Sequence, residues 1–300
     1  MKYPLLSILL LLQLSIHSQT LKGRVLDSIT DEKLAYVNLV IKDKKIGVYS
    51  NENGDYNLDL TKTTTKDTLV VSLIGYESKK ISLSRFIKPN EYTLNFQLVP
   101  KVESLDEILI VSKIKTYSNN KTQFSSGNRK QVFPVSVPFG YETAILIDNP
   151  KHKKGKLVEL HLKYKDSNND NYETYQTYYR LAFYNIDDLG FPGELLHFEN
   201  IIIKPKKDSK NYKLSFEDKS IPFTEKGIFV GIATVQPGYI EIKNAMYLTT
   251  PSLLHTHTKN IQKYTRFRSN DWSKNSRKSV FKKKLYAVPF IKATVVYEKT

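Results

Sequence analysis

The stretch LVVSLIGYE, residues 69–77, is a near-continuous apolar run rich in β-branched residues, and it ends at Gly75-Tyr76. This composition is typical of a strand buried in the middle of a sheet. Further short strands, several with a period-two alternation of apolar and polar residues, are indicated at residues 21–26, 35–42, 47–50, 56–60 and 92–99. No helix-period segment interrupts them. About seven short strands in about 80 residues predict a small antiparallel sandwich.

The landmarks of this region occur in the order of a known family. They are Gly23-Arg24-Val25-Leu26-Asp27, Leu34–Leu39, Gly47 with Ser50–Tyr56, and Leu73–Glu77. In these residues the sequence resembles the carboxypeptidase-regulatory-like domain, which is common in exported proteins of Bacteroidota bacteria. The resemblance implies an N-terminal, seven-stranded, transthyretin-like sandwich over residues 20–100. It implies an accessory module and not a peptidase.

The segment Ser104–Val111, SLDEILIV, resembles the strand that follows this domain in TonB-dependent receptors. A receptor barrel of ~22 strands needs more than the about 190 residues that follow, so we expect a protein of another kind. The apolar positions Leu105, Ile108 and Ile110 are candidates for strand addition to an outer-membrane protein partner. The alternative is a plain extra strand or linker.

Residues 101–130 are predicted to be this short strand and a basic, serine-rich linker. The strand pattern resumes over residues 131–300, with clear alternation at 158–164 and 178–184 and a dense apolar run at 227–235. Eight or more strands predict a larger jelly-roll-like β-sandwich. Arg180–Tyr184, Asp187–Glu194 and Gly227–Ile232 resemble a sandwich module of Bacteroidota surface proteins.

Residues 1–19 have the form of a secretory signal peptide, with Lys2 followed by an apolar run from Leu5 to Leu14. That run is too short for the ~20 residues of a spanning helix, and no later segment is apolar enough. The chain has no cysteine, which excludes disulfides, thiol chemistry and lipid attachment through an N-terminal cysteine. We therefore expect an exported protein, periplasmic or associated with the outer membrane, and not a lipoprotein. A chain that ends at its last strand favours the same location.

The chain carries 46 Lys and Arg against 30 Asp and Glu, a formal net charge of +16. This excess favours anionic partners, and export makes nucleic acid an unexpected one. The partners that we expect are a glycan, an anionic lipid or an acidic polysaccharide. The alternative is a lysine-rich solvated surface without a ligand.

No catalytic, cofactor or metal site is predicted. The chain lacks an HExxH motif, a glycine-rich phosphate loop and a GxSxG motif. His255 and His257 would share one face of a strand, but no third metal ligand is identifiable. The runs Asp166–Asp170 and Asp187-Asp188 could supply oxygen ligands for calcium, and solvated turns explain them equally well.

The segment Lys259–Lys284 combines basic and aromatic side chains, which bind anions by charge and sugars by stacking. Its candidate ligand-binding residues are Tyr264, Arg266, Arg268, Trp272, Lys282, Lys283 and Lys284. The alternative is a long solvated loop in which Trp272 packs locally. The sequence thus predicts a non-enzymatic envelope protein that binds or scaffolds. The alternatives are a polysaccharide hydrolase with its active site in the second sandwich and a purely structural protein.

Overall fold

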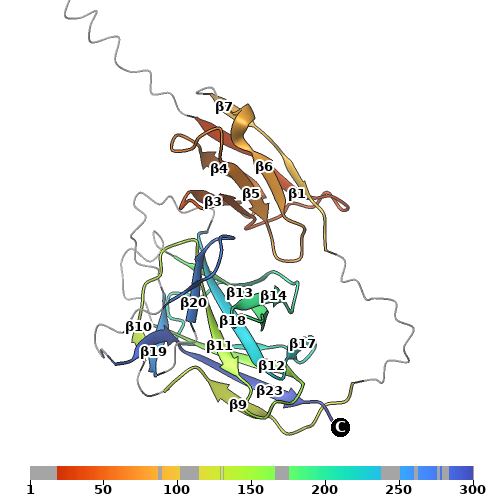
Figure 1. The fold of residues 1–300 in the computed structure, drawn as a ribbon, viewed down its shortest axis with the longest axis vertical. Helices are drawn as coiled ribbons and strands as arrows, with labels where there is room; N and C mark the ends of the chain where they lie inside the picture. Colours follow the sequence, from red (N-terminus) through yellow and green to blue (C-terminus); the bar gives the residue numbers. More distant parts are fainter. Residues whose placement is uncertain are drawn as a thin grey trace, which may run out of the picture.

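The computed structural model describes residues 19–86, 90–101, 115–128, 130, 132–165, 176–237, 251–259, 263–275, 278 and 284–299. These residues form an all-β protein with two separate sets of sheets (Figure 1). We call residues 19–101 the N-terminal sandwich and residues 115–299 the C-terminal sandwich. The all-β class and the small-then-large order of the two sandwiches confirm the prediction from sequence. Among the described residues, no helix is long and apolar enough to cross a bilayer.

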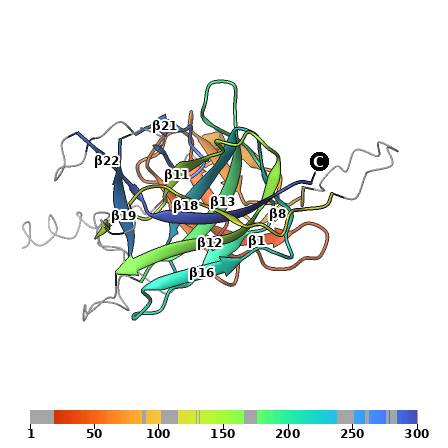
Figure 2. The ribbon, with the colours of Figure 1, turned by 90° about the horizontal axis from the view of Figure 1, so that it is seen from below.

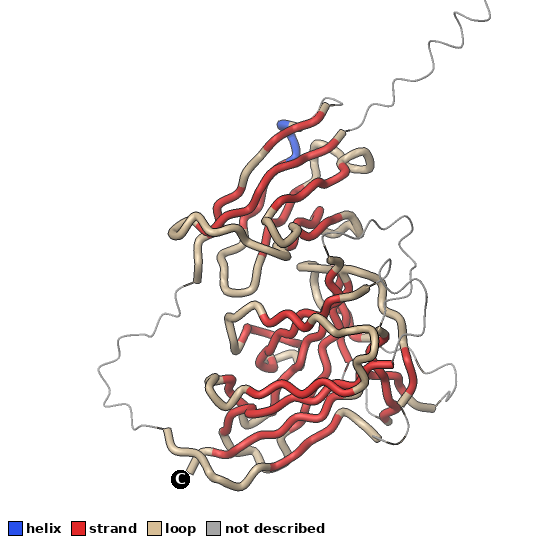
Figure 3. The backbone as a smooth tube through the Cα atoms, turned by 180° about the vertical axis from the view of Figure 1, so that it is seen from behind, coloured by secondary structure: helices blue, strands red, loops and turns tan. Residues whose placement is uncertain are grey.

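The N-terminal sandwich consists of two four-stranded sheets, seen edge-on in Figure 3. The first contains β4 (Asp55–Asp59), β1 (Thr20–Asp27), β7 (Glu91–Thr93) and β8 (Phe96–Leu98). The second contains β3 (Gly47–Tyr49), β2 (Asn38–Ile41), β5 (Thr68–Ser72) and β6 (Lys79–Ser82), followed by a short 3₁₀ helix, Leu83–Arg85. Alternate residues such as Leu21, Val25, Leu39 and Val71 fill the core between the sheets. This is the period-two burial that the sequence predicts.

Two features of the first sheet differ from the expectation. The segment predicted as one strand, residues 92–99, forms β7 and β8, and both pair with β1 in parallel rather than antiparallel orientation. Between them, Leu94 N–H donates to Lys22 O and the Asn95 side chain accepts from Arg24 N–H. Gly23 lies opposite this break, where an added Cβ would overlap the carbonyl of Leu94. Glycine is therefore required at this position for the two backbones to approach each other.

We expect Gly23→Ala to lower the free energy of unfolding by about 2 kcal/mol, because the new methyl group must push β7 and β8 away from β1. Urea denaturation followed by circular dichroism measures this loss. Gly190→Asn is the control, since nothing lies within 4 Å of a Cβ there and Asn tolerates the positive φ of that residue. An equal and small effect of both substitutions would contradict the role of Gly23.

The C-terminal sandwich is built from an eight-stranded and a seven-stranded sheet. The eight-stranded sheet has the order β10 (Phe133–Pro134), β19 (Ser252–Thr258), β12 (Gly155–Lys165), β23 (Ile291–Tyr297) and β9 (Thr122–Ser125). Off this path, β16 (Asn211–Ser215) and β17 (Ile221–Phe223) pair with β12, and β22 (Tyr286–Pro289) pairs with β19. β9 lies in the segment for which a linker is predicted, and it is instead held by antiparallel pairing with β23.

The seven-stranded sheet has the order β14 (Pro192–Leu195), β13 (Tyr178–Ile186), β18 (Gly227–Val235), β11 (Tyr141–Asp148), β20 (Lys263–Phe267) and β21 (Ser273–Lys274). The short strand β15 (Ile201–Ile203) also pairs with β13. Seen from below, β12 and β16 of the other sheet lie in front of β13 and β18 (Figure 2). The two sheets therefore face each other across a core.

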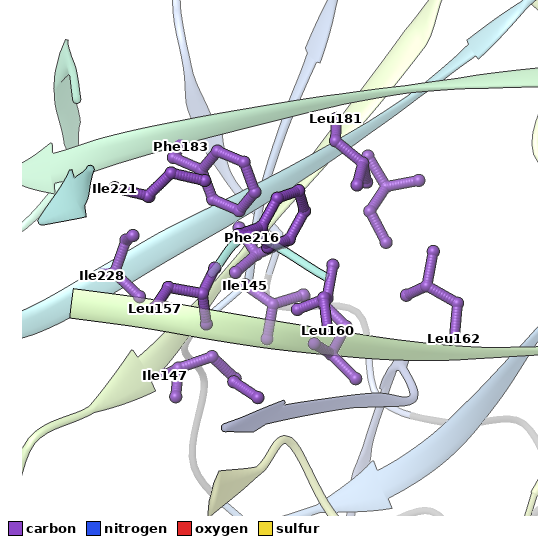
Figure 4. Packing of buried hydrophobic residues seen from close by; sticks show 14 of the residues in the cluster. Ile145, Ile147, Leu157, Leu160, Leu162, Leu181, Phe183, Phe216, Ile221 and Ile228 are labelled. Atoms are coloured by element: carbon purple, nitrogen blue, oxygen red, sulfur yellow. The ribbon is translucent and has the colours of Figure 1, made fainter. Parts of the chain in front are cut away.

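The core between these sheets is filled by large apolar side chains from both (Figure 4). Leu157 and Leu160 come from β12, and Leu181 and Phe183 from β13. Phe216, which follows β16, packs edge-on against Phe183 with ring centroids 5.6 Å apart. All of β13 up to Tyr184 is buried, so the opposite face of this strand must also be covered.

Candidate functional site

The outer face of the seven-stranded sheet carries a row of charged side chains. Pairing aligns Arg180 on β13 with Ala233 on β18, Ala233 with Glu142 on β11, and Glu142 with Arg266 on β20. Because Leu181 faces the core, Arg180 points to the other face. The alternation of strand residues therefore brings two arginines and one glutamate to one level of this face.

Glu142 is bonded to Arg266 in this row and to Tyr184, which lies farther along β13. Its Oε1 accepts a hydrogen bond from the Tyr184 hydroxyl at 2.8 Å, and its Oε2 accepts one from Arg266 Nε at 2.8 Å. Arg266 Nη2 lies 2.7 Å from the same Oε2 atom. Burial alone would lower the pKa of Arg266, but the charge of Glu142 outweighs it and raises that pKa. Burial raises the pKa of the Tyr184 phenol well above its usual value. These groups form a satisfied, buried ion pair.

Trp272 covers this pair from the turn that joins β20 to β21. The Arg266 guanidinium lies 4.1 Å from the centroid of the Trp272 ring, and Tyr184 packs edge-on against the same ring at 5.6 Å. Trp272 is half-buried and packs with Tyr264 in an apolar cluster on this face. The aromatic ring thus lies against the guanidinium as in a cation–π contact.

Arg180 and Arg268 reach from the C-terminal into the N-terminal sandwich. Arg180 Nη2 donates to the carbonyl of Tyr36, and Arg268 donates to Asn38 Oδ1 at 3.1 Å and to the carbonyl of Gly47 at 3.0 Å. Both guanidiniums lie against the ring of Tyr49 on β3, at 5.5 Å and 4.1 Å from its centroid. Buried side chains therefore join two parts of the chain that are separated by up to 230 residues.

A cavity of about 270 Å³ lies where the two sandwiches meet, and we call it the junction cavity. The N-terminal sandwich contributes Asn38, Tyr49, Ser72, Leu73, Ile74, Tyr76, Ser78 and Lys101. The C-terminal sandwich contributes Gly140, Glu142, Arg180, Tyr184, Leu195, Ala233, Arg266, Arg268 and Ser269. The cavity is therefore complete only when the two sandwiches are docked.

The described lining of the junction cavity is strongly positive. It contains four basic side chains and one carboxylate, Glu142, which is bonded to Arg266. Arg180 is 8% exposed and Arg268 is 9% exposed, and burial lowers the pKa of both guanidiniums. The Nε atom of each is buried without a hydrogen-bond partner in the described part of the chain. Two buried cations thus lie at this cavity without a carboxylate bonded to either of them.

Four of the predicted ligand-binding residues lie on or beside this cavity. Arg266 and Arg268 line it, and Tyr264 and Trp272 pack in the adjoining apolar cluster. The structure thus places them in and around the hairpin of β20 and β21, in contact with other strands, and Trp272 packs locally on Arg266 and Tyr184. Lys284 is exposed. Lys282, Lys283 and the candidate partner strand with Leu105, Ile108 and Ile110 lie outside the described residues.

Reasoning from sequence did not select Arg180, Glu142, Asn38 or Tyr49 as site residues. The signal for Arg180 is a charged residue inside a strand that is otherwise largely apolar, since Tyr179 and Leu181 flank it on β13. A charge in such a place must find a partner when the strand is buried. Asn38 and Tyr49 give no such signal, because their role depends on the docking of the two sandwiches.

A larger cavity, of about 740 Å³, lies at β12 and β17 and carries a different charge pattern. Its lysines Lys115, Lys154, Lys156 and Lys226 are accompanied by Glu225 and Glu298, and Lys115 pairs with Glu298 at 3.4 Å. Its positive charges thus have carboxylates beside them. We therefore regard the junction cavity, whose buried arginines lack them, as the candidate functional site.

His255 and His257 do share one face of a strand, β19. Both rings pack against Phe133, at 6.5 Å and 4.5 Å between centroids. Within the described ranges, no group of three His, Cys, Asp or Glu side chains is placed to hold a metal ion. His255 is 4% exposed, and burial lowers its pKa to about 3. Its environment is that of a neutral core residue.

This burial predicts a pH dependence of stability. The unfolded chain, in which His255 has a pKa near 6.5, takes up a proton that the folded protein refuses until about pH 3. The stability that neutral His255 contributes to the folded protein is fully present above pH 6.5. It is lost as the pH falls, and the loss in the free energy of unfolding is about 2 kcal/mol at pH 5. We expect His255→Gln to lose less stability between pH 7 and pH 5 than the wild type, as measured by urea denaturation. The exposed His152→Gln is the control, and equal losses in all three proteins would contradict this assignment.

Comparisons with solved structures find only distant likenesses. A streptococcal ancillary pilin matches at 9% identity and a TM-score of 0.23, over 88% of this chain and 64% of its own. A putative membrane-associated protein of unknown function from Bacteroides fragilis matches at 11% identity and a TM-score of 0.21, over 93% and 97% of the two chains. A DUF3823 family protein from Bacteroides uniformis gives 9% identity and a TM-score of 0.21, over 92% and 98%. Likenesses this weak carry no argument about function.

The chain spans less than two thirds of the length of the pilin that it matches. No curated protein shows significant sequence similarity to it. The family model that matches describes a domain that is typically non-catalytic, and no catalytic family was found. The matched range includes Leu105, Ile108 and Ile110. Residues 21–110 of this chain match the CarboxypepD_reg-like domain.

Proposed function

We propose that the protein is a non-catalytic binding module of the bacterial cell envelope, and that its ligand is a glycan bound in the junction cavity. The observation that carries this proposal is that residues of both sandwiches line one cavity. Concave sites between domains are common places for ligands. The match of residues 21–110 to a domain that is usually a binding module supports the same role.

The chemistry of the cavity favours retention of a ligand over its turnover. A glycoside hydrolase uses two carboxyl groups, one on each side of the scissile bond. In the described lining of the junction cavity Glu142 is the sole carboxylate, and its oxygens already accept from Arg266 and Tyr184. A group held in this way is poorly suited to exchange protons with a substrate. The arginine and tyrosine side chains of the lining can hold a ligand by charge, hydrogen bonds and stacking without cleaving it.

The proposed location follows from the amino-terminal sequence. The apolar run Leu5–Leu14 behind Lys2 directs export, and a chain without cysteine is common among bacterial envelope proteins. The ligands that such a protein meets are the polysaccharides and lipids of the envelope, which are rich in acidic groups. The net charge of +16 agrees with such surroundings.

A glycan array tests this function when it is probed with the wild type and two tryptophan variants. Ser78 is exposed and lines the cavity, so Ser78→Trp should block access to it. Ser84 is equally exposed in the 3₁₀ helix, does not line the cavity and serves as the matched control. We expect the wild type and Ser84→Trp to retain a glycan and Ser78→Trp to lose it. Equal retention by all three proteins, or release of cleaved products, would overturn the proposal.

A further inference from the structure

We propose that Arg180 and Arg268 bind an oxyanion, a carboxylate, sulfate or phosphate group, in the junction cavity. This inference rests on the proposed function, because it names the part of the ligand that the same cavity recognises. The oxyanion comes either from a free inorganic anion or from an acidic sugar. Both have the planar or tetrahedral array of oxygens that guanidinium groups bind best.

The first reason is the balance of charge. Arg180 and Arg268 are nine-tenths buried, and neither forms an ion pair within the described residues. Glu142, the one carboxylate in the described lining of the cavity, is already paired with Arg266. A buried cation without a counter-charge is strongly unfavourable, and an anion between the two arginines would remove that penalty.

The second reason is the supply of hydrogen-bond donors. A guanidinium has five N–H groups, and the described contacts of Arg180 use one while those of Arg268 use two. The Nε–H of each has no hydrogen-bond partner among the described residues. The hydroxyl groups of Ser72 and Ser269 lie 2.6 Å apart in the lining, where both also accept from the Asn38 amide. The lining thus offers more donors than the protein itself uses.

The third reason is the way in which Arg268 is held. It has a φ of 52°, a left-handed conformation that non-glycine residues seldom adopt. Its side chain passes between Gly47 and Gly140, where an added Cβ would lie 2.9 Å and 3.2 Å from its Nε atom. Strained backbone that the surroundings enforce is concentrated at binding sites. Here the residue held in this conformation is one of the two buried cations that line the cavity.

The size of the cavity suits a small acidic group. Its volume of about 270 Å³ is several times the ~30 Å³ that one water molecule occupies in the liquid. It accommodates an inorganic oxyanion with its water, or one acidic sugar unit. A folded macromolecular partner could present only a terminal group of this size.

Thermal unfolding of the purified protein tests the site with three probes, sodium sulfate, sodium phosphate and sodium glucuronate. The controls are sodium chloride at matched ionic strength and glucose, which carries no charge. We expect at least one of the oxyanions at saturating concentration to raise the Tm by about 5 °C more than chloride does. Sulfate stabilises many proteins through exclusion from their surfaces, so each shift is compared with that of a variant.

The variants are Arg180→Gln, Arg268→Gln and the control Lys206→Gln, which removes an exposed charge away from the cavity. We expect both arginine variants to lose the specific shift and Lys206→Gln to keep it. Arg268→Lys retains the charge, and it is expected to fold and to keep part of the shift even where a Gln variant unfolds. Isothermal titration of the same anions into the wild type gives the affinity directly.

The outcomes separate the two proposals. A shift with sulfate or phosphate supports a free oxyanion as the ligand, and a shift with glucuronate alone supports an acidic sugar. If both arginine variants abolish anion binding and no glycan on the array is retained by the wild type, the glycan-binding function is refuted and the oxyanion site stands. The absence of any shift beyond that of chloride, or shifts that persist in both arginine variants, would overturn the oxyanion site even if neutral glycans bind.

Discussion

Replacement of Glu142 by Gln is expected to lower the free energy of unfolding by about 3–5 kcal/mol, because it leaves Arg266 as a buried cation without a counter-charge. Glu142 is 6% exposed and accepts from both Arg266 and Tyr184, so the substitution removes the one negative charge bonded to Arg266 within the described residues. Urea denaturation measures the loss as a lower midpoint with an unchanged slope.

Two further variants identify the cause of that loss. Glu217→Gln breaks an ion pair with Lys121 whose side chains are 62% and 52% exposed, and it should change stability little. The double variant Glu142→Gln/Arg266→Met removes both charges and should recover much of the loss. Equal effects of Glu142→Gln and Glu217→Gln, or a double variant no more stable than Glu142→Gln, would contradict a buried pair.

Phe183→Ala is expected to cost about 3–5 kcal/mol, because it opens a cavity in the middle of the C-terminal core. Phe183 is 1% exposed and packs between the two sheets against Phe216. The loss should appear in thermal or urea unfolding of the whole protein. Leu189→Ala removes a similar apolar side chain that is 83% exposed, and it should change stability by no more than about 0.5 kcal/mol. A loss below about 1 kcal/mol for Phe183→Ala would show that this core is not packed as described.

Much of the fold could be predicted from the spacing of apolar residues. Strands such as β5 and β13 can be predicted because their β-branched residues or their alternation of side chains are visible in the local sequence. This pattern does not depend on which strands they pair with. The direction of pairing could not be predicted, since the same alternation serves a parallel or an antiparallel neighbour. Gly23, which permits the parallel approach of β7 and β8 to β1, looks in the sequence like any glycine near a strand.

The candidate site could be predicted only in part. The mixture of basic and aromatic residues singled out Arg266, Arg268 and Trp272, but it described them as a surface segment. The burial of Arg268 depends on contacts with Asn38 and Gly47, more than 200 residues away in sequence. No local pattern encodes such a contact. Arg180, a charged residue within the largely apolar strand β13, is the local signal in the sequence that points to the site.

The central claim is that the two sandwiches dock to form one cavity, and an engineered disulfide tests it most directly. The Ser72 and Ser269 hydroxyl oxygens lie 2.6 Å apart across the junction, which places their Cβ atoms near the range that a disulfide needs. The chain has no cysteine, so Ser72→Cys/Ser269→Cys introduces a unique pair. The control pair is Ser72→Cys/Ser220→Cys, because Ser220 lines the separate cavity at β12 and β17.

The measurement is the number of free thiols after mild oxidation, with the cross-link located by mass spectrometry of a digest. We predict that the Ser72/Ser269 pair loses both thiols and joins the two sandwiches in nearly every molecule, while the control pair stays reduced. Free thiols in the Ser72/Ser269 pair, or equal cross-linking of the two pairs, would contradict the docking on which the junction cavity depends.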